Sequence, residues 1–289
     1  IAELKARVMS GKVDDEEDEY GILGGMLIYE PDKARSVLGR GAFGTIRKMV
    51  NPHDHQVYAV KELSNLTLED GSTDEVAMNE LLDEVRKMGV VRSEFIVQYR
   101  TSAVWQGRFY VMMDPVLGVD FRDVVVARQA TEVHFANEQV AAWGLQLALG
   151  LSHLHDECHL VHQDLHNGNV MITGLCKDVD GTISVDDILL ATTSVKILDL
   201  GLASFKSDHA HHTCTMRMGT MRTMRTQAAT KKDACVELNS DDIGGFKAIR
   251  APEMHPRVPH GRVRFDAKID VWALGMLLTE AILLLPIEE

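Results

Sequence analysis

Cysteine is scarce in this sequence, and its spacing excludes two common small-domain architectures. The 289 residues contain four cysteines, and none forms the paired C-x-x-C spacing of a zinc ribbon or part of a dense disulfide framework. The N-terminus has no charged segment followed by an apolar one, so secretion is not indicated. We therefore expect a reducing location, cytoplasmic or nuclear. The chain starts at Ile1 rather than at methionine, which indicates an excerpt of a longer protein.

Positive charge is also in deficit. The chain has 30 Lys and Arg residues against 43 Asp and Glu residues, a net charge of −13. We expect no nucleic-acid partner, because phosphate backbones are bound by clustered cations. Part of the acidic excess lies in residues 14–19, which we interpret as a solvated tail. The longest mostly apolar segment, residues 271–287, contains Thr279 and Glu280 and is near the lower length limit for a membrane span, so we expect none.

The chemistry is concentrated in one short segment and one tripeptide. Residues 162–169 read His-Gln-Asp-Leu-His-Asn-Gly-Asn, and residues 199–201 read Asp-Leu-Gly. These residues supply one acid, Asp164, and two side chains that bind metal ions, Asn169 and Asp199. Phosphoryl transfer needs an oriented acceptor hydroxyl and neutralised phosphate charge rather than elaborate covalent chemistry. The pattern therefore indicates phosphoryl transfer.

Six segments in the same order resemble the protein kinase superfamily, and the resemblance covers roughly residues 35–289. These segments are Gly39–Gly44, Tyr58–Lys61, His162–Asn169, Asp199–Gly201, Ala251–Glu253 and Asp270–Gly275. The glycine-rich segment alone is also typical of dinucleotide-binding folds, in which a helix follows the glycines. Here a strand pattern follows, and Lys61 stands where such folds have an acidic residue. The kinase form of the loop is therefore favoured.

The resemblance implies an α+β, bilobal protein-kinase-like fold. Its small N-lobe would hold a β-sheet plus one helix, and its C-lobe would be mainly helical. We expect an acidic N-terminal extension at residues 1–34, the N-lobe at 35–115 and the C-lobe at 116–289. A low-complexity insertion is expected at about 206–240. Kinases continue with further helices beyond the apolar one at 271–287, so we expect a C-lobe that lacks its last helices.

The family also implies roles for the residues of the active site. Asp164 would be the catalytic base, and Asn169 and Asp199 would hold Mg²⁺. Lys61 would contact the α- and β-phosphates of ATP. A glutamate of the helix expected at residues 74–92 would hold Lys61 in place. The family's helix-to-strand spacing favours Glu84, with Glu80 as the alternative.

The ATP-binding residues implied by the resemblance come from three places. The glycine loop would approach the phosphates, nearby apolar side chains would enclose adenine, Met113 would be the gatekeeper, and the hinge would contact adenine through backbone groups. This set consists of Leu38, Gly39, Gly41, Ala42, Phe43, Gly44, Ile46, Ala59, Lys61, Met113, Asp114 and Val116.

Three positions depart from the family pattern. His166 replaces a lysine that contacts the γ-phosphate, Gln163 replaces an arginine of the catalytic loop, and Phe246 stands where a Gly-Thr pair usually shapes the substrate-docking loop. The D-x-H-x-x-N form also resembles small-molecule phosphotransferases. We expect an ATP-dependent protein kinase acting on Ser or Thr of protein substrates, with regulators unknown. A pseudokinase scaffold that binds nucleotide without transfer and a small-molecule phosphotransferase remain the alternatives.

Overall fold

The computed structural model describes residues 21–23, 25–41, 44–65, 75–106, 108–206, 236–239, 246–255 and 262–287. The chain divides into two compact units. The first consists of Ile1–Val90 and Val97–Val116, and the second of Val91–Ile96 and Leu117–Glu289.

The first unit is built on an antiparallel sheet with the strand order β1-β2-β4-β5-β7-β6, and β3 pairs with β4. Its strands are β1 (Gly21–Ile22), β2 (Leu27–Tyr29), β3 (Val37–Gly41), β4 (Gly44–Val50), β5 (Val57–Asn65), β6 (Tyr99–Trp105) and β7 (Arg108–Met113). Helix α2 (Glu75–Val90) follows β5. The expected helix at 74–92 is therefore present. In the sequence it lies between strands β1 to β5 and strands β6 and β7.

The connection between β4 and β5 is closed by short polar side chains. The backbone N–H of His53 donates to Oδ1 of Asn51 at 2.9 Å, and that of Gln56 donates to Oδ1 of Asp54 at 2.9 Å. Such bonds from Asn and Asp to the backbone two residues on are typical of tight turns. This turn sets the β4–β5 pairing, which brings Ile46 opposite Lys61.

A hairpin of β1 and β2 precedes the glycine loop and extends the sheet through the pairing of β2 with β4. Its buried side chains join an apolar cluster that includes Ile22, Leu27, Tyr29, Met49, Val60, Tyr110 and Met112. These strands lie inside the region 1–34 that we expected to be an acidic extension. Part of that region therefore forms strands of the sheet, and its apolar side chains contribute to the core.

The second unit combines helices with three small sheets. The sheets pair β11-β10-β8, β12-β9 and β13-β14. The strands are β8 (Gly118–Asp120), β9 (Leu160–Val161), β10 (Val170–Thr173), β11 (Ser194–Ile197), β12 (Ser204–Phe205), β13 (Val236–Asn239) and β14 (Arg262–Phe265). The helices are α3 (Phe121–Gln129), α4 (Asn137–Ser152) with a π-helical turn at His153–Glu157, α5 (Asp187–Leu190), α6 (Lys268–Leu283) and two 3₁₀ turns at Lys247–Ile249 and Pro252–Met254.

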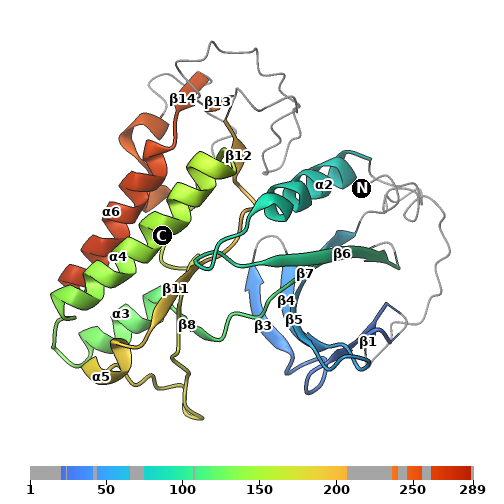
Figure 1. Ribbon diagram of the computed structural model, residues 1–289, viewed down its shortest axis with the longest axis horizontal. Coiled ribbons are helices and arrows are strands. Elements are labelled where there is room, and N and C mark those ends of the chain that lie inside the picture. Colours follow the sequence, from blue (N-terminus) through green and yellow to red (C-terminus); the bar gives the residue numbers. More distant parts are fainter. Residues whose placement is uncertain are drawn as a thin grey trace. The chain divides into compact units, whose positions relative to one another are not determined.

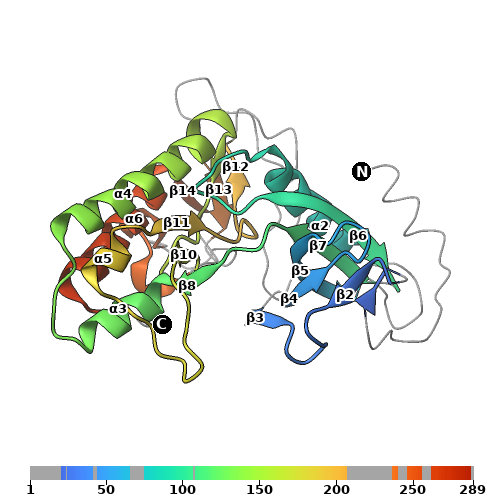
Figure 2. The ribbon, with the colours of Figure 1, turned by 60° about the horizontal axis from the view of Figure 1, so that its bottom comes forward.

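The core of the second unit is centred on α4, which runs beside α6 in both ribbon views (Figures 1 and 2). Trp143 of α4 is fully buried, and its ring meets those of Phe121 and Phe135 edge-on at centroid distances of 5.9 and 5.2 Å. Its indole N–H donates to Oγ1 of Thr193 at 3.0 Å. This buried aromatic group with a satisfied polar atom anchors the helix that precedes residues 162–169, the expected catalytic loop.

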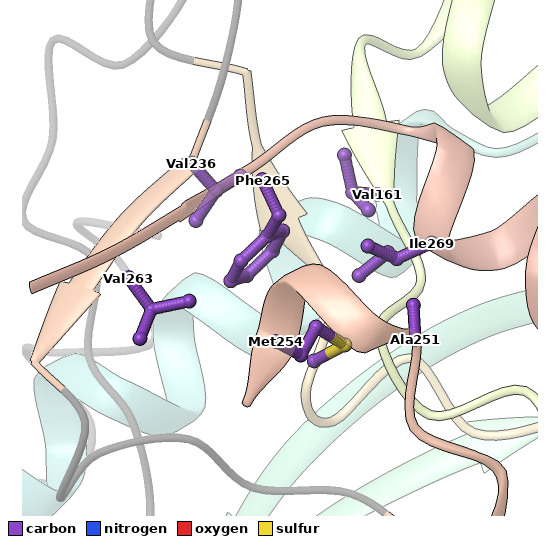
Figure 3. Packing of buried hydrophobic residues seen from close by; sticks show 7 residues of the cluster. All are labelled: Val161, Val236, Ala251, Met254, Val263, Phe265 and Ile269. Carbon is purple, nitrogen blue, oxygen red and sulfur yellow. The ribbon is translucent and has the colours of Figure 1, made fainter. Parts of the chain in front are cut away.

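A second apolar cluster supports the segment around Ala251. Figure 3 shows the Phe265 ring between the paired strands β13 and β14 and the short helical turn that carries Met254. The remaining members of this cluster are Val161, Val236, Ala251, Val263 and Ile269. Strand β13 falls within the insertion expected at about 206–240, so that insertion ends in an ordered strand. Most of the insertion, including residues 207–235, lies outside the described residues.

Helix α6 covers most of the apolar segment 271–287. Among the residues that the structure describes, no helix is both long and apolar enough to cross a bilayer.

Candidate active site

A buried ion pair occupies the centre of the first unit. The Lys61 ammonium lies 3.1 Å from Oε1 of Glu84, and both residues are buried. Glu84 is carried by α2, whose buried residues Leu82 and Val85 hold this side of the helix against the core. The side chain of Glu80, the alternative partner, lies outside the described residues. Glu84 is thus the residue that the structure pairs with Lys61.

The strand register gathers the side chains that we expected around the nucleotide on one face of the sheet. Ile46 of β4 is opposite Lys61 of β5, and Ala59 of β5 is opposite Met113 of β7. Directly opposed residues of antiparallel strands have their side chains on the same face, and so do residues two apart within a strand. Ile46, Ala59, Lys61 and Met113 therefore share a face, and Ala59 and Met113 are buried.

The glycine loop is the turn between β3 and β4. Gly41 pairs with Gly44, and Gly44 has a φ of 131°, a backbone conformation that side chains disfavour. Gly39 pairs with Ile46, and Leu38 in β3 is exposed. Ala42 and Phe43, at the tip of the turn, lie outside the described residues. The required glycine geometry is therefore present at the base of the loop.

The expected hinge follows β7. The carboxylate of Asp114 forms a two-pronged ion pair with Arg100, including a bond of 2.7 Å from the guanidinium to Oδ2. The backbone N–H of Asp114 donates to the carbonyl of Gln98 at 2.9 Å. The carbonyl oxygen of Asp114 is therefore the main-chain group that this residue could offer to the adenine ring. Val116 ends the first unit and is half-buried.

In the second unit, the start of the catalytic loop is held by Asp270 of α6. Its carboxylate accepts bonds from the backbone N–H of His162 at 2.8 Å and of Gln163 at 2.9 Å. His155 Nε2 donates a third bond at 2.7 Å. Asp270 is almost fully buried, so these donors replace the water that an ionised carboxylate requires. The backbone just before Asp164 is fixed as a result.

His162 links this loop to the strand that leads to Asp199. Its ring is fully buried, and Nε2 donates to the carbonyl of Leu198 at 3.0 Å. The backbone N–H of Asp164 donates to the other ring nitrogen at 3.3 Å. The His162 side chain thus contacts both the backbone of Asp164 and that of Leu198, the residue before the candidate metal ligand Asp199.

The carboxylate of Asp164 is held at both oxygens. Oδ1 accepts the backbone N–H of Phe246 at 3.0 Å, and Oδ2 lies 3.3 Å from the side-chain nitrogen of Asn169. Burial raises the pKa of this carboxyl above its ordinary value, and the nearby histidines and the Phe246 N–H offset part of that rise. A fixed, desolvated carboxylate of increased basicity is suited to receive a proton.

The pairing of β10 with β11 brings Asn169 and Asp199 together. Val170 is opposite Ile197, and the N–H of Leu198 donates to the carbonyl of Asn169 at 2.8 Å. Asp199 has a φ of 46°, and its Oδ1 accepts the N–H of Gly201 at 2.9 Å. Asn169 immediately precedes β10 and Asp199 lies two residues after β11, so the two candidate metal ligands are at the same end of this ladder.

The chemistry of these donors suits Mg²⁺. Both side chains offer oxygen ligands, the type that hard divalent cations prefer, and Mg²⁺ commonly takes one or two protein ligands with substrate phosphates completing its shell. Within the described part of the chain, no group of three or more His, Cys, Asp or Glu side chains is arranged to hold a metal by itself. Asn169 and Asp199 thus fit a cation that arrives with its nucleotide.

Comparison with known proteins decides the family. The family model of the protein kinase domain matches residues 33–287. The chain belongs to the protein kinase domain family. A serine/threonine-protein kinase of Caenorhabditis elegans is 26% identical over 257 residues, which are 86% of this chain and 21% of that protein. Ribosomal protein S6 kinase 2 beta of Xenopus laevis is 31% identical over 163 residues, 55% of this chain and 23% of that protein.

A third relative, ribosomal protein S6 kinase alpha-1 of Homo sapiens, is 29% identical over 168 residues, 55% of this chain and 20% of that protein. The chain therefore spans about a fifth of the length of these three relatives. The expected membership and the α+β kinase fold are confirmed.

The catalytic loop of this kinase domain has a second attachment that sequence reasoning missed. The side-chain nitrogen of Asn167 donates to Oε2 of Glu280 at 2.6 Å, and the N–H of Ile287 donates to the same oxygen at 3.1 Å. Burial raises the pKa of Glu280, and these two hydrogen bonds oppose the rise. No local pattern signals a bond between residues so far apart in the sequence.

Gln163, one of the departures from the kinase pattern, carries a cost in stability. It is buried with 7% of its surface exposed, and neither polar atom of its side chain has a hydrogen-bond partner among the described residues. The side chain lines a cavity of about 20 Å³. An unsatisfied buried amide destabilises a fold, because it has lost its bonds to water.

We expect Gln163→Met to raise the free energy of unfolding by about 1 kcal/mol, since an apolar side chain of similar length removes the unsatisfied amide. Denaturant unfolding would measure the change. The matched control is Gln139→Met, since buried Gln139 donates to Oγ1 of Thr193 at 3.4 Å and its loss should lower stability. A loss for Gln163→Met as large as that of the control would contradict the prediction and indicate that a solvent molecule satisfies the amide.

Proposed function

We propose that this protein is an ATP-dependent protein kinase that transfers the γ-phosphate to Ser or Thr residues of protein substrates and uses Mg²⁺. The observation that carries the proposal is the arrangement at Asp164, whose carboxylate is fixed at both oxygens beside Asn169. The relatives named as serine/threonine kinases support the same class of acceptor.

In the proposed reaction, Asp164 orients the acceptor hydroxyl and takes its proton. The hydroxyl oxygen forms a bond to the γ-phosphorus, and the bond from that phosphorus to the bridging oxygen breaks with its electron pair remaining on ADP. Transfer is largely a matter of positioning and electrostatics. The Asp270, His162 and Phe246 contacts therefore contribute by fixing the geometry of Asp164 before the substrate arrives.

Lys61 would bind the nucleotide phosphates, with Glu84 directing its ammonium. Ile46, Ala59 and Met113 share its face of the sheet and offer an apolar surface for adenine. Bound Mg²⁺ would neutralise phosphate charge, held on the protein side by Asn169 and Asp199. The residues of both units thus suit the same reaction.

The direct test is transfer of labelled γ-phosphate from Mg-ATP to generic Ser/Thr-containing proteins and to the chain itself. Phosphoamino-acid analysis would identify the acceptor. Label on serine or threonine supports the proposal. Label on a soluble alcohol but not on protein would support a small-molecule phosphotransferase instead, and nucleotide binding without any transfer would support a scaffold.

We expect Lys61→Met to reduce transfer about 100-fold, because a charge-assisted contact to the phosphates is lost. The variant also leaves Glu84 buried without its partner, so a melting curve must accompany the assay. Replacing both residues, as Lys61→Met with Glu84→Leu, removes the stranded charge and should recover stability without recovering activity. The exposed Lys177, paired with Asp123, provides the control variant Lys177→Met. Full activity in Lys61→Met would contradict the assigned role.

A further inference from the structure

Two contacts fix the ring of His166, which lies beside Asp164, the proposed catalytic base. The ring stacks on that of Phe246 with centroids 4.9 Å apart and planes inclined by 16°. The backbone N–H of Gly168 donates to Nδ1 at 3.1 Å, and Nε2 lies 3.8 Å from Oδ2 of Asp164. The ring is therefore held at one face and at one nitrogen, and its other nitrogen faces the carboxylate of Asp164.

The Gly168 contact determines where the ring carries its hydrogen. A nitrogen that accepts a hydrogen bond cannot itself bear the hydrogen in a neutral imidazole, so the N–H group must be Nε2. Nε2 is the nitrogen that faces Asp164. His166 accordingly presents its Nε2–H group to Asp164 as a hydrogen-bond donor.

Gly168 also leaves the space that this arrangement needs. A Cβ at residue 168 would lie 3.0 Å from Cε1 of the His166 ring and 3.2 Å from Nδ1. Such contacts are tighter than side chains normally make, so a side chain at residue 168 would require the ring to shift by a few tenths of an ångström. Gly168 therefore leaves room for the ring in the position where it stacks on Phe246.

The distance between Nε2 of His166 and Oδ2 of Asp164 allows one hydroxyl to contact both atoms. At 3.8 Å, Nε2 and Oδ2 are too far apart for a direct hydrogen bond. An oxygen to one side of the line that joins them can lie about 2.8 Å from each atom, a normal hydrogen-bond length. Such a hydroxyl would donate to Oδ2, accept from Nε2 and keep one lone pair for attack on phosphorus.

We propose that His166 binds the acceptor hydroxyl together with Asp164, and that the Phe246 ring is the positioning residue that holds His166 in place. Phe246 serves both partners, because its backbone N–H bonds Oδ1 of Asp164 while its ring stacks on His166. The substrate-docking segment and the catalytic loop are thereby joined by an aromatic pair. This inference rests on the proposed kinase activity.

Side-chain variants isolate the ring, because every one of them keeps the Phe246 N–H. His166→Phe preserves the stack and removes the donor, and we expect a drop in kcat of about 10- to 100-fold with an unchanged KM for ATP. Phe246→Leu should lower kcat about tenfold, and Phe246→Tyr should recover most of that loss. The neighbouring exposed Lys247 provides the control Lys247→Ala, and melting curves check the fold of each variant.

A double-mutant cycle tests whether Phe246 acts through His166. The combined variant His166→Phe with Phe246→Leu should be no slower than His166→Phe alone, because the ring has no donor left to position. Additive losses, or an unchanged kcat in His166→Phe, would overturn the proposal.

Nuclear magnetic resonance of ¹⁵N-histidine-labelled protein gives a readout that does not depend on activity. We expect His166 to show a hydrogen on Nε2 and none on Nδ1, and Phe246→Leu to shift the ring protons by loss of the aromatic ring current. A hydrogen on Nδ1 would overturn the assignment. If the wild-type protein transfers no phosphate while these signals are as expected, the proposed function fails and the stacked geometry stands.

Discussion

Asp164→Asn is expected to reduce phosphoryl transfer by about 10²- to 10⁴-fold, the range that a positioned general base contributes. Asparagine is nearly isosteric and keeps an oxygen that can accept the Phe246 N–H. It cannot receive a proton from the acceptor hydroxyl. The labelled-phosphate assay would measure the loss, and nucleotide binding by the variant should persist.

The same substitution should leave the fold at least as stable as the wild type. The pKa of the Asp164 carboxyl is raised by burial, so its ionised form opposes folding, and this group's contribution to stability is lost as the pH rises through that pKa. A neutral asparagine avoids this cost. A variant that loses both activity and stability would indicate a structural role for Asp164 and contradict its assignment as the base.

Asp270→Asn is expected to lower the free energy of unfolding by about 3 to 5 kcal/mol, the range for breaking a buried charged network. The carboxylate accepts the N–H of His162, the N–H of Gln163 and Nε2 of His155. An asparagine offers one acceptor oxygen and turns an N–H group toward the other donors. Denaturant unfolding monitored by circular dichroism would measure the change.

The control for this prediction is Asp123→Asn, which removes a solvent-exposed ion pair with Lys177. Exposed pairs contribute about 0 to 1 kcal/mol, so the two variants should differ severalfold. Equal losses would show that Asp270 does not brace the catalytic loop. Transfer activity should fall with Asp270→Asn as well, because the backbone that it holds leads directly into the acid.

The sequence predicted the parts of the site whose chemistry is recorded in short motifs. Lys61, Asp164 and Asn169 each stand in a local pattern, and apolar periodicity located the helix that carries Glu84. Contacts between distant segments could not be predicted from such local patterns. The stack of His166 on Phe246 joins residues from separate segments, and nothing near either residue predicts the other.

The β1–β2 hairpin shows a different limit of the sequence reasoning. The acidic run at 14–19 predicts a solvated tail, and the apolar residues that follow it are too few to predict strands by themselves. Ile22, Leu27 and Tyr29 acquire their meaning only when Met49 and Val60 complete the cluster. Short strands of this kind are defined by their partners, because isolated hairpins are marginal in water.

The ladder of β10 and β11 places Asn169 beside Asp199 whatever the length of chain between the two strands. The connection from residue 174 to residue 193 leaves the ladder and returns, with an exposed turn around Gly181. Doubling the length of a flexible loop costs only about 0.6 kcal/mol. The tip of this turn is therefore a suitable place to insert an epitope or a fluorescent reporter. Residues added there would increase the separation of Asn169 and Asp199 along the chain and leave their separation in space unchanged.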